Sequence, residues 1–381
     1  MTMTRNNVMV VGAGEVGRYA AEYLVRFPIV REILLVDINE IRGKMVAYNA
    51  EIAGAIHKYY PRIVYEKLDV TDTDKTVDLL RKYKPQVILH VATLMSSFYY
   101  QHLAKPYIKA KKLPFKSHLA GHTFAKDFYL IYKLMQAVKQ SDIDTRVVNL
   151  AFPDNTNVVL GKLGLAPTIG AGTIDLTAHG VKKYIAEKLN LKIHNIHVTM
   201  VVHHAQRTMD AKYVPYYIKI QKANGEDITD NFDLVEVLNK GAYYTGIWGG
   251  DNSPMTAASA VDNMIALLSD SGVIKHAPGP AGLPGGWPVQ INWDEVKVML
   301  PKDISMEKAM EINLEGMKMD GIERVENDGT VVFTKETVEY MATVLDMHWT
   351  KVKPEETLEM SKELIAAYKK LEEKMKQEGL K

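Results

Sequence analysis

Short apolar runs alternate with amphipathic stretches over the first 150 residues of the chain. The runs at 8–11 (VMVV) and 33–36 (ILLV) have the length and composition of buried strands, and between them apolar residues recur at helical spacing from Val16 to Phe27. A strand, a helix and a second strand within about thirty residues form a βαβ unit, which builds parallel sheets. Further strands are predicted at 63–70, 86–92 and 145–151, and further helices at 74–83 and 124–139. This alternation predicts a doubly wound parallel α/β sheet.

The second part of the chain follows a different pattern, in which strands and helices no longer alternate regularly. Strands are predicted at 194–204, 214–223, 296–301 and 330–334, and a helix over 255–269. Proline and glycine cluster at 277–288, where we expect an ordered loop, and a charged amphipathic helix runs from Glu355 to Lys381. We therefore expect two domains, the parallel domain at 1–150 and an α+β substrate domain with a C-terminal helix at 151–381.

The composition is ordinary for a globular protein and removes several classes of site. Hydrophobic residues make up 47% of the 381 residues, and 47 basic against 46 acidic residues give a formal net charge of +1. This balance gives no reason to expect nucleic acid or an anionic membrane as a partner. The chain has no cysteine, which excludes disulfides and thiolate chemistry, and no apolar stretch approaches the roughly 18 residues of a membrane span. We expect a cytoplasmic protein, and nothing in the sequence indicates a metal.

A glycine-rich turn directly follows the first predicted strand and opens the first predicted helix. Its sequence, Gly12-Ala13-Gly14-Glu15-Val16-Gly17, fits the pattern GxGxxG in the context that dinucleotide binding requires. Gly12 permits the tight turn, Gly14 admits a pyrophosphate close to the backbone, and Gly17 lets helix and sheet pack together. The helix N-terminus offers amides and a positive dipole end to the phosphates. The alternative is a tight strand–helix turn without a ligand.

An acidic residue, Asp37, ends the second predicted strand. A carboxylate there accepts hydrogen bonds from ribose hydroxyls and repels a 2′-phosphate, so we expect NAD rather than NADP. Asp69 and Val70 follow the third strand, where such folds hold the adenine edge, and we place Ala92, from the fourth strand, in the same site. The sequence therefore predicts a Rossmann-type domain that binds NAD.

Two adjacent histidines, His203 and His204, close the predicted strand at 194–204. Oxidation of an alcohol requires a base near neutral pH, and imidazole suits that role. Since side chains alternate along a strand, only one of the two points into a given cleft. Asp175 is a candidate to orient that imidazole and to stabilise its charged form. Alternatively, each histidine is a satisfied core residue or a partly exposed strand end.

The stretch from Val147 to Arg207 resembles the lactate and malate dehydrogenase family. It contains a strand that ends in Asn149 and is followed by a proline, the glycine-rich turn GAGTIDL, the helix HGVKKYIAEKLNL and the strand IHVTMVVHHAQ. The resemblance implies that Asn149 is the active-site asparagine, that Asp175 pairs with the base, and that His204 is the base. It implies NAD-dependent hydride transfer on a C–OH group of a small-molecule substrate. We also expect a homo-oligomer, either a dimer or a tetramer.

Two departures from the family pattern concern the substrate. In that family an arginine three residues after the aspartate holds the substrate carboxylate, but Ala178 stands at this position. The family's mobile loop also carries arginines, whereas Arg146 is the only arginine between Lys82 and Gln206. Since arginine is the residue suited to bidentate carboxylate recognition, we do not expect a simple 2-hydroxy acid. Arg207 or lysines of the loop after the fourth strand are candidate replacements.

That loop, 96–122, carries five lysines between 105 and 116. It follows the fourth strand at the carboxyl edge of the sheet, where ligands bind in such folds. One interpretation is a lid that brings aromatic and cationic groups over the substrate, and the other is a solvated basic segment or a subunit contact.

A second resemblance covers 68–93 (LDVTDTDKTVDLLRKYKPQVILHVAT), which is similar to saccharopine dehydrogenases and extended short-chain dehydrogenases. It implies the alternative of a saccharopine- or opine-type dehydrogenase that acts on a C–N bond. Tyr129 and Lys133 have the spacing of the short-chain tyrosine–lysine pair, but they precede the strand at 145–151 and are interpreted as ordinary helix residues. A further alternative is an NAD-binding regulatory protein without catalysis.

Overall fold

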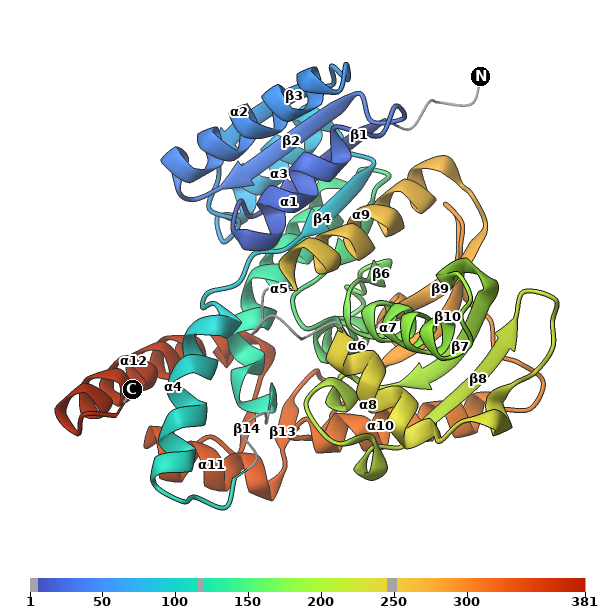
Figure 1. Cartoon of the computed structure of the whole chain (residues 1–381). Helices are drawn as coiled ribbons and strands as arrows, with labels where there is room; N and C mark the ends of the chain where they lie inside the picture. The colour runs from blue at the N-terminus through green and yellow to red at the C-terminus, as the bar shows by residue number, and fades with distance from the viewer. Residues whose placement is uncertain (1–5, 116–119, 245–251, 381) are drawn as a thin grey trace.

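Six parallel strands form the first sheet, in the order β3-β2-β1-β4-β5-β6 (Figure 1). The computed structural model describes residues 6–115, 120–244 and 252–380. The strands are β1 (Asn7–Val11), β2 (Glu32–Asp37), β3 (Arg62–Lys67), β4 (Val87–His90), β5 (Arg146–Asn149) and β6 (Ile169–Gly170). This order confirms the doubly wound Rossmann-type sheet, and its direction reverses between β1 and β4, where a ligand crevice opens. The sheet takes β6 from beyond residue 150, so it extends past the predicted domain boundary.

Helices cover both faces of this sheet because its strands are apolar on both sides. In β1, Val8 and Val10 join one core cluster and Met9 and Val11 the other, as alternation along a strand requires. The first face packs against α1 (Glu15–Leu24), α2 (Glu40–Ile56) and α9 (Ser253–Ser269), and the second against α3 (Thr73–Tyr83) and α5 (Phe124–Ser141). Thus α9, from the second half of the chain, completes the first domain.

An antiparallel sheet forms the centre of the second part, which confirms the predicted α+β organisation (Figure 1). Its strands are β7 (Ile196–Val202), β8 (Tyr216–Lys222), β9 (Val273–Pro278), β10 (Gly286–Ile291) and β11 (Val296–Val298). The helices around it are α6 (Pro153–Lys162), α7 (Thr173–Lys188), α8 (Leu234–Tyr244) and α10 (Met306–Met319). The predicted loop at 277–288 is wrong at both ends, because β9 extends to Pro278 and β10 begins at Gly286.

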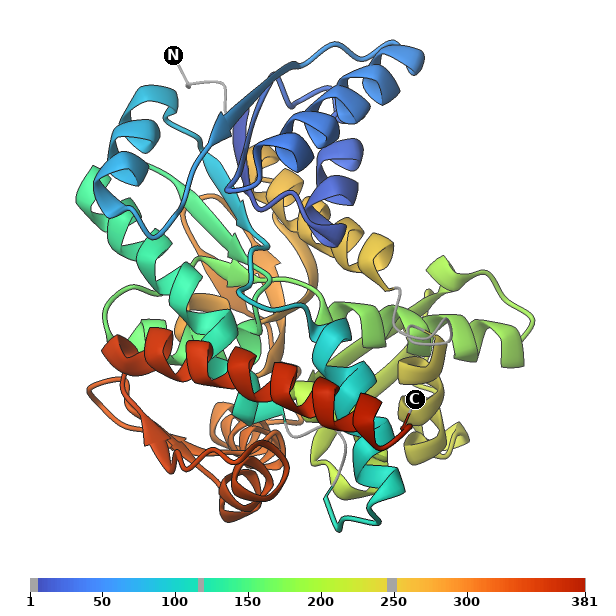
Figure 2. The same cartoon turned by 90° about the vertical axis from the view of Figure 1, so that its left-hand side faces the viewer.

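A third, smaller lobe contains a three-stranded sheet and the C-terminal helix. Its elements are β12 (Ile322–Val325), β13 (Val331–Phe333), β14 (Lys351–Val352), α11 (Lys335–Leu345) and α12 (Thr357–Gln377). The short 3-10 helices of the chain are η1 (Ala120–Thr123), η2 (Ile193–Asn195), η3 (His204–Arg207), η4 (Ala211–Tyr213), η5 (Thr229–Asn231), η6 (Pro280–Gly282) and η7 (Pro354–Glu356). Figure 2 shows α12 crossing over α5 and α4, both of which it contacts.

The predicted loop at 96–122 is a helix, α4 (Ser97–Ala110), over half of its length. Tyr100, Ala104 and Tyr107 recur at helical spacing and are buried in the core, which is why this lysine-rich segment is ordered. Two side-chain pairs hold α4 to the C-terminal end of the chain, Tyr99–Glu372 (2.7 Å) and Tyr107–Lys374 (2.8 Å), and a third, Lys111–Glu378 (2.8 Å), holds the residue that follows α4. Lys116, the last of the five lysines, lies outside the described residues. Nowhere in the described part of the chain is a helix long and apolar enough to cross a membrane.

Candidate active site

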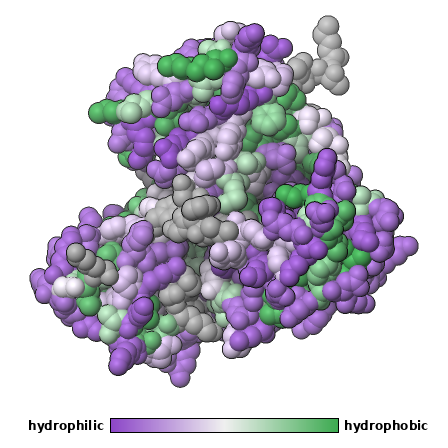
Figure 3. Space-filling model, viewed as in Figure 1, coloured by the Kyte–Doolittle hydropathy of each residue, from purple (hydrophilic) through white to green (hydrophobic). Residues whose placement is uncertain are grey.

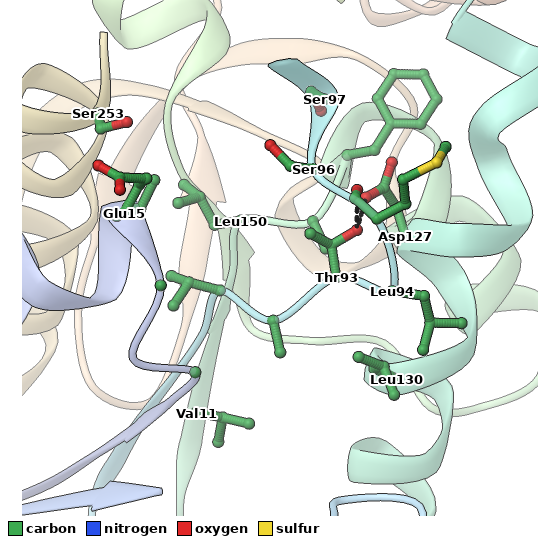
Figure 4. Close-up of a pocket in the computed structure, with 18 of the residues that line it drawn as sticks. Val11, Glu15, Thr93, Leu94, Ser96, Ser97, Asp127, Leu130, Leu150 and Ser253 are labelled. Atoms are coloured by element: carbon green, nitrogen blue, oxygen red, sulfur yellow. Dashed lines mark hydrogen bonds between the residues drawn. The ribbon is translucent and has the colours of Figure 1, made fainter. Parts of the chain in front are cut away.

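A cavity of about 1670 Å³ begins at the carboxyl ends of β1, β2 and β4 and continues to η3 and α4. Figure 3 shows the surface hollowed between the lobe with β1–β3 and the lobe with α4 and α12, and Figure 4 shows Glu15 and Ser253 on one side of the cavity and Thr93 and Asp127 on the other. Eight of the predicted cofactor residues line it: Gly12, Gly14, Glu15, Val16, Asp37, Asp69, Val70 and Ala92. Residues predicted from separate strands are therefore brought together in one crevice.

The three glycines of the turn differ in what surrounds them. Gly12 has a φ of +106°, which favours glycine. A Cβ on Gly17 would lie 1.9 Å from the carbonyl oxygen of Gly12, so no side chain fits between helix and turn. A Cβ on Gly14 would meet nothing within 4 Å. The backbone at Gly14 is therefore open to the cavity, as close approach of a pyrophosphate to the amides of α1 requires.

The carboxylate of Asp37 is buried and fixes the glycine-rich turn. It accepts hydrogen bonds from the backbone N–H of Ala13 (2.7 Å) and of Asn39 (2.7 Å). The guanidinium of Arg42 also lies 2.8 Å from the Asp37 carboxylate, and the Arg42 side chain is 49% exposed beside the cavity. The charge that would repel a 2′-phosphate thus has a cationic neighbour, which the sequence prediction did not include.

Asp69 and Ala92 form two other parts of the crevice wall. The Asp69 carboxylate accepts hydrogen bonds from the backbone N–H (2.9 Å) and the hydroxyl (2.7 Å) of Thr71, which closes the turn after β3. The backbone of Ala92 approaches Gly12 so closely that a Cβ on Gly12 would lie 3.1 Å from the Ala92 nitrogen. Both residues therefore line the cavity and shape the crevice.

His204 is the first residue of η3 and lines the opposite end of the cavity. Its Nδ1 lies 2.7 Å from the Oδ2 of Asp320, and its side chain is 23% exposed. The edge of its ring packs on Phe152, with 5.2 Å between ring centroids. No described residue hydrogen bonds to Nε2. The imidazole is thus held from one side by a carboxylate while its other nitrogen remains available to a ligand.

The charges around this pair favour the ion pair over the neutral form. Burial lowers the pKa of His204, but the charge and hydrogen bond of Asp320, with the nearby Asp154, outweigh burial and raise the pKa above its ordinary value. Burial would raise the pKa of Asp320, yet His204 and His203 hold it at about 2. The pair therefore has the arrangement of a general acid–base histidine with an orienting carboxylate.

The predicted pairing of Asp175 with His204 is wrong. Asp175 lies in α7, where its carboxylate accepts a hydrogen bond from Ser259 (2.7 Å) and pairs with Lys275 (3.1 Å). Burial raises its pKa, but Lys275 and His179 overcome this and lower it. Asp320 takes the predicted place instead, because it caps the C-terminus of α10, which packs against β7 and η3.

The structure does not place Asn149, which the resemblance implies to be the active-site asparagine, on the cavity. Its amide is buried, and Nδ2 donates to Thr156 (3.0 Å) and Asn157 (2.8 Å). Its Oδ1 accepts from the backbone N–H of Ala151 (3.0 Å) and lies 3.1 Å from His90 Nδ1. With these bonds made, Asn149 joins the ends of β4 and β5 to α6 and does not line the cavity.

His203 is fully buried and does not line the cavity, but it is not independent of His204. Its Nδ1 lies 3.3 Å from the same Asp320 oxygen, and its Cβ would collide with any side chain at Gly316. The two histidines therefore share one carboxylate. The sequence carries no spacing signal for Asp320, since this residue lies 116 positions away from His204.

Ala178 stands where the family resemblance implies an arginine, and a different arginine, Arg207, lines the cavity. Ala178 is fully buried in α7. Arg207 lines the cavity at the other end of η3 from His204, and residues three apart in a 3-10 helix lie on the same side. Burial lowers the pKa of Arg207 to about 10, against the charge of Asp154, so it remains a cation at neutral pH.

Comparison with solved structures supports the fold. No family model matches the sequence, and no curated protein matches it. Among solved structures, a lactate dehydrogenase from a Medee basin deep-sea metagenome library is similar at 15% identity with a TM-score of 0.61, covering 83% of this chain and 97% of the other. A malate dehydrogenase from Salinibacter ruber has 17% identity and a TM-score of 0.57 over 82% and 94% of the two chains. A Cryptosporidium parvum lactate dehydrogenase, complexed with lactic acid and NAD, has 13% identity and a TM-score of 0.59 over 84% and 96%. At these identities the likeness shows the fold.

Proposed function

We propose that this chain is an NAD-dependent oxidoreductase that transfers a hydride to or from a C–OH carbon of a small substrate. The observation that carries the proposal is a single cavity with the glycine-rich turn at one end and the His204–Asp320 pair near the other. A dinucleotide on the turn would extend along this cavity toward η3. The solved structures of similar fold include dehydrogenases with NAD or NADH bound, which supports the same cofactor here.

The residues of the chain supply binding, orientation and proton transfer. The amides of α1 and the open face of Gly14 fit the pyrophosphate, and Asp37 lies at the end of β2, where ribose hydroxyls bind in such folds. Bound NAD would accept the hydride. In alcohol oxidation, Nε2 of His204 takes the hydroxyl proton, and the Asp320 carboxylate stabilises the imidazolium that results. In the reverse direction the imidazolium returns the proton to the carbonyl oxygen.

A substitution at Gly14 tests the cofactor site without disturbing the fold. The φ of Gly14 is −73°, and a side chain there meets no protein atom within 4 Å. Gly14→Val should therefore keep the melting temperature of the wild type while abolishing NADH binding, measured by fluorescence titration. Unchanged NADH affinity in this variant would show that the dinucleotide does not bind at the turn.

The substrate is proposed to be something other than lactate or malate. With Ala178 buried, no guanidinium stands at the position that holds the carboxylate in the family that the sequence resembles. A screen of hydroxy acids, sugars and amino acids with NAD should find lactate and malate to be poor substrates. Efficient, saturable turnover of either would contradict this, and activity on amino acids alone would favour a C–N dehydrogenase. NAD binding with no activity on any class would favour a regulatory protein.

We also infer that two copies of the chain associate through α2, in keeping with the expected homo-oligomer. Large apolar side chains are exposed along one stripe of this helix: Ile41 (75%), Met45 (57%), Tyr48 (60%), Ile52 (60%) and Ile56 (73%). Their spacing of three and four residues places them on one side of α2. Figure 3 shows green atoms in separate patches on the lobe with β1–β3. The cytoplasm remains the location predicted from the sequence.

A further inference from the structure

The wall of the cavity around His204 carries three threonine side chains that come from three different parts of the chain. Thr173 is the first residue of α7, Thr208 directly follows η3, and Thr256 lies in the first turn of α9. Helix α7 packs against both η3 and α9, and a Cβ on Gly172, the residue before Thr173, would lie 3.5 Å from the Cγ2 of Thr256. We call Thr173, Thr208 and Thr256 the threonine wall.

Two of these hydroxyls donate their proton inside the protein. The hydroxyl of Thr173 donates to the Oδ2 of Asp154 (3.2 Å), and that of Thr208 donates to the carbonyl oxygen of Ala205 (3.0 Å). Since a hydroxyl has a single proton, both groups can only accept a hydrogen bond from the cavity. Nε2 of His204 also accepts, because it takes the proton of the reacting hydroxyl. This wall therefore favours a ligand that donates hydrogen bonds.

The carboxylate of Asp154, behind the threonine wall, sets the charge of this end of the cavity. Asp154 is fully buried in the first turn of α6, where the helix dipole favours an anion, and its Oδ1 has no hydrogen-bond partner in the described part of the chain. Its charge acts on His204 and on the guanidinium of Arg207. A substrate carboxylate beside Arg207 would be repelled by Asp154 and would meet hydroxyls that cannot donate to it. An ammonium in the same place would be repelled by Arg207.

We propose that the substrate is an uncharged polyol, in which the carbinol that reacts at His204 has a neighbouring hydroxyl group that donates to the threonine wall. The inference rests on the proposed function, because His204 marks the carbon that reacts. On oxidation, the hydride of this carbon passes to bound NAD and its hydroxyl proton passes to Nε2 of His204, while the neighbouring hydroxyl is unchanged. The products are a hydroxyketone and NADH.

Two sets of matched ligands test the charge of the substrate without requiring turnover. Propane-1,2-diol, 1-amino-2-propanol and lactate share one carbinol and one methyl group, and they differ only in the neighbouring hydroxymethyl, aminomethyl or carboxylate group. Glucitol, glucamine and gluconate form the corresponding set with a longer chain. Binding of each ligand to the NAD-loaded protein would be measured by ligand-observed NMR titration. The polyol should bind about tenfold more tightly than the carboxylate in at least one set.

Two variants and a control test the residues. Asp154→Asn keeps an oxygen for the Thr173 hydroxyl but removes the charge that opposes Arg207, so lactate and gluconate should bind about tenfold more tightly than to the wild type, with polyol affinity unchanged. Thr256→Val should weaken polyol binding about fivefold, and it leaves no described group without a partner, because this hydroxyl makes no hydrogen bond to a described residue. Thr199→Val is the matched control: Thr199 is partly buried like Thr256, also makes no such hydrogen bond and lies outside the cavity, so polyol affinity should not change.

The proposal would be overturned if the carboxylate bound as tightly as the polyol in both sets, if the amine bound most tightly, or if neither polyol bound. A polyol preference that neither Asp154→Asn nor Thr256→Val alters would also overturn it. Polyol binding without any NAD-linked turnover would leave the polyol site standing and refute only the oxidoreductase.

Discussion

His204 and Asp320 are 116 positions apart in the sequence and 2.7 Å apart in the structure. If they form the acid–base pair, His204→Asn should leave NADH affinity intact and lower turnover by roughly two to four orders of magnitude, the usual worth of a positioned general acid or base. Asp320→Asn keeps the shape but removes the charge, so turnover should also fall. Steady-state kinetics with the best substrate from the screen would measure both.

The pH profile distinguishes the orienting carboxylate from a residue that only stabilises the fold. Alcohol oxidation requires neutral His204, whose pKa is raised by Asp320, so activity should fall as the pH drops through that raised value. Asp320→Asn removes the cause and should move this acid limb to lower pH. Asp175→Asn is the control, since it breaks the contact with Lys275 and should lower the melting temperature without moving the limb. If the acid limb moved in Asp175→Asn and not in Asp320→Asn, the result would support the pairing of Asp175 with His204 that the structure contradicts.

Cofactor preference depends on the balance of charge at Asp37 and Arg42. The wild type should bind NADH more tightly than NADPH, because the Asp37 carboxylate lies where a 2′-phosphate would stand. Asp37→Asn should lower the ratio of NADH affinity to NADPH affinity. Arg42→Ala should raise this ratio, since it removes the guanidinium that lies 2.8 Å from Asp37 and would attract a 2′-phosphate. Fluorescence titrations with both cofactors would check this, and equal or stronger NADPH binding by the wild type would show that Asp37 is misplaced.

At the scale of elements, the contact between the turn and α1 should tolerate a side chain at Gly14 but not at Gly17. Gly17→Ala places a Cβ 1.9 Å from a carbonyl oxygen of the turn, so we expect a loss of about 1–3 kcal/mol in the free energy of unfolding. Gly14→Ala, where the space is open, should leave this free energy within about 0.5 kcal/mol of the wild type. Urea denaturation would compare the pair, and equal stabilities would contradict the packing described for α1.

Among the other elements, α4 illustrates how tertiary contacts decide a secondary structure. Pro106 lies inside it, and a proline at that point argues against a continuous helix when the sequence is considered alone. Contact with α12 and the buried side chains of Tyr100 and Tyr107 make it a helix. The wall of the cavity is consequently held by the C-terminal end of the chain.

At the scale of the whole molecule, the exposed stripe of α2 predicts the assembly. Ile52→Glu should reduce the mass measured by light scattering after gel filtration to that of a smaller species, because the interface would bury two like charges. Ile274→Glu is the matched control: it has the same exposed fraction, 60%, but lies on β9. A monomeric wild type, or a mass that Ile52→Glu does not change, would contradict association through α2.

The sequence by itself determined the Rossmann-type sheet, the place of the glycine-rich turn and Asp37. These features are local or periodic. Short apolar runs between amphipathic stretches specify the strands, and the turn needs glycine where helix, turn and β4 meet. The pair His203 and His204 was predicted in the same way, as polar residues that end a buried strand, and the choice of His204 came from the family resemblance.

Only the tertiary structure decided which groups surround His204. Asp175 and Asn149 have the residue types and spacing of a catalytic site, but their polar atoms bond to α9, β9 and α6. Asp320 comes from a segment with no recognisable motif and reaches His204 because α10 packs on β7 and η3. A contact between side chains on different elements depends on how those elements dock, and the period of hydrophobic residues along one element does not contain that information.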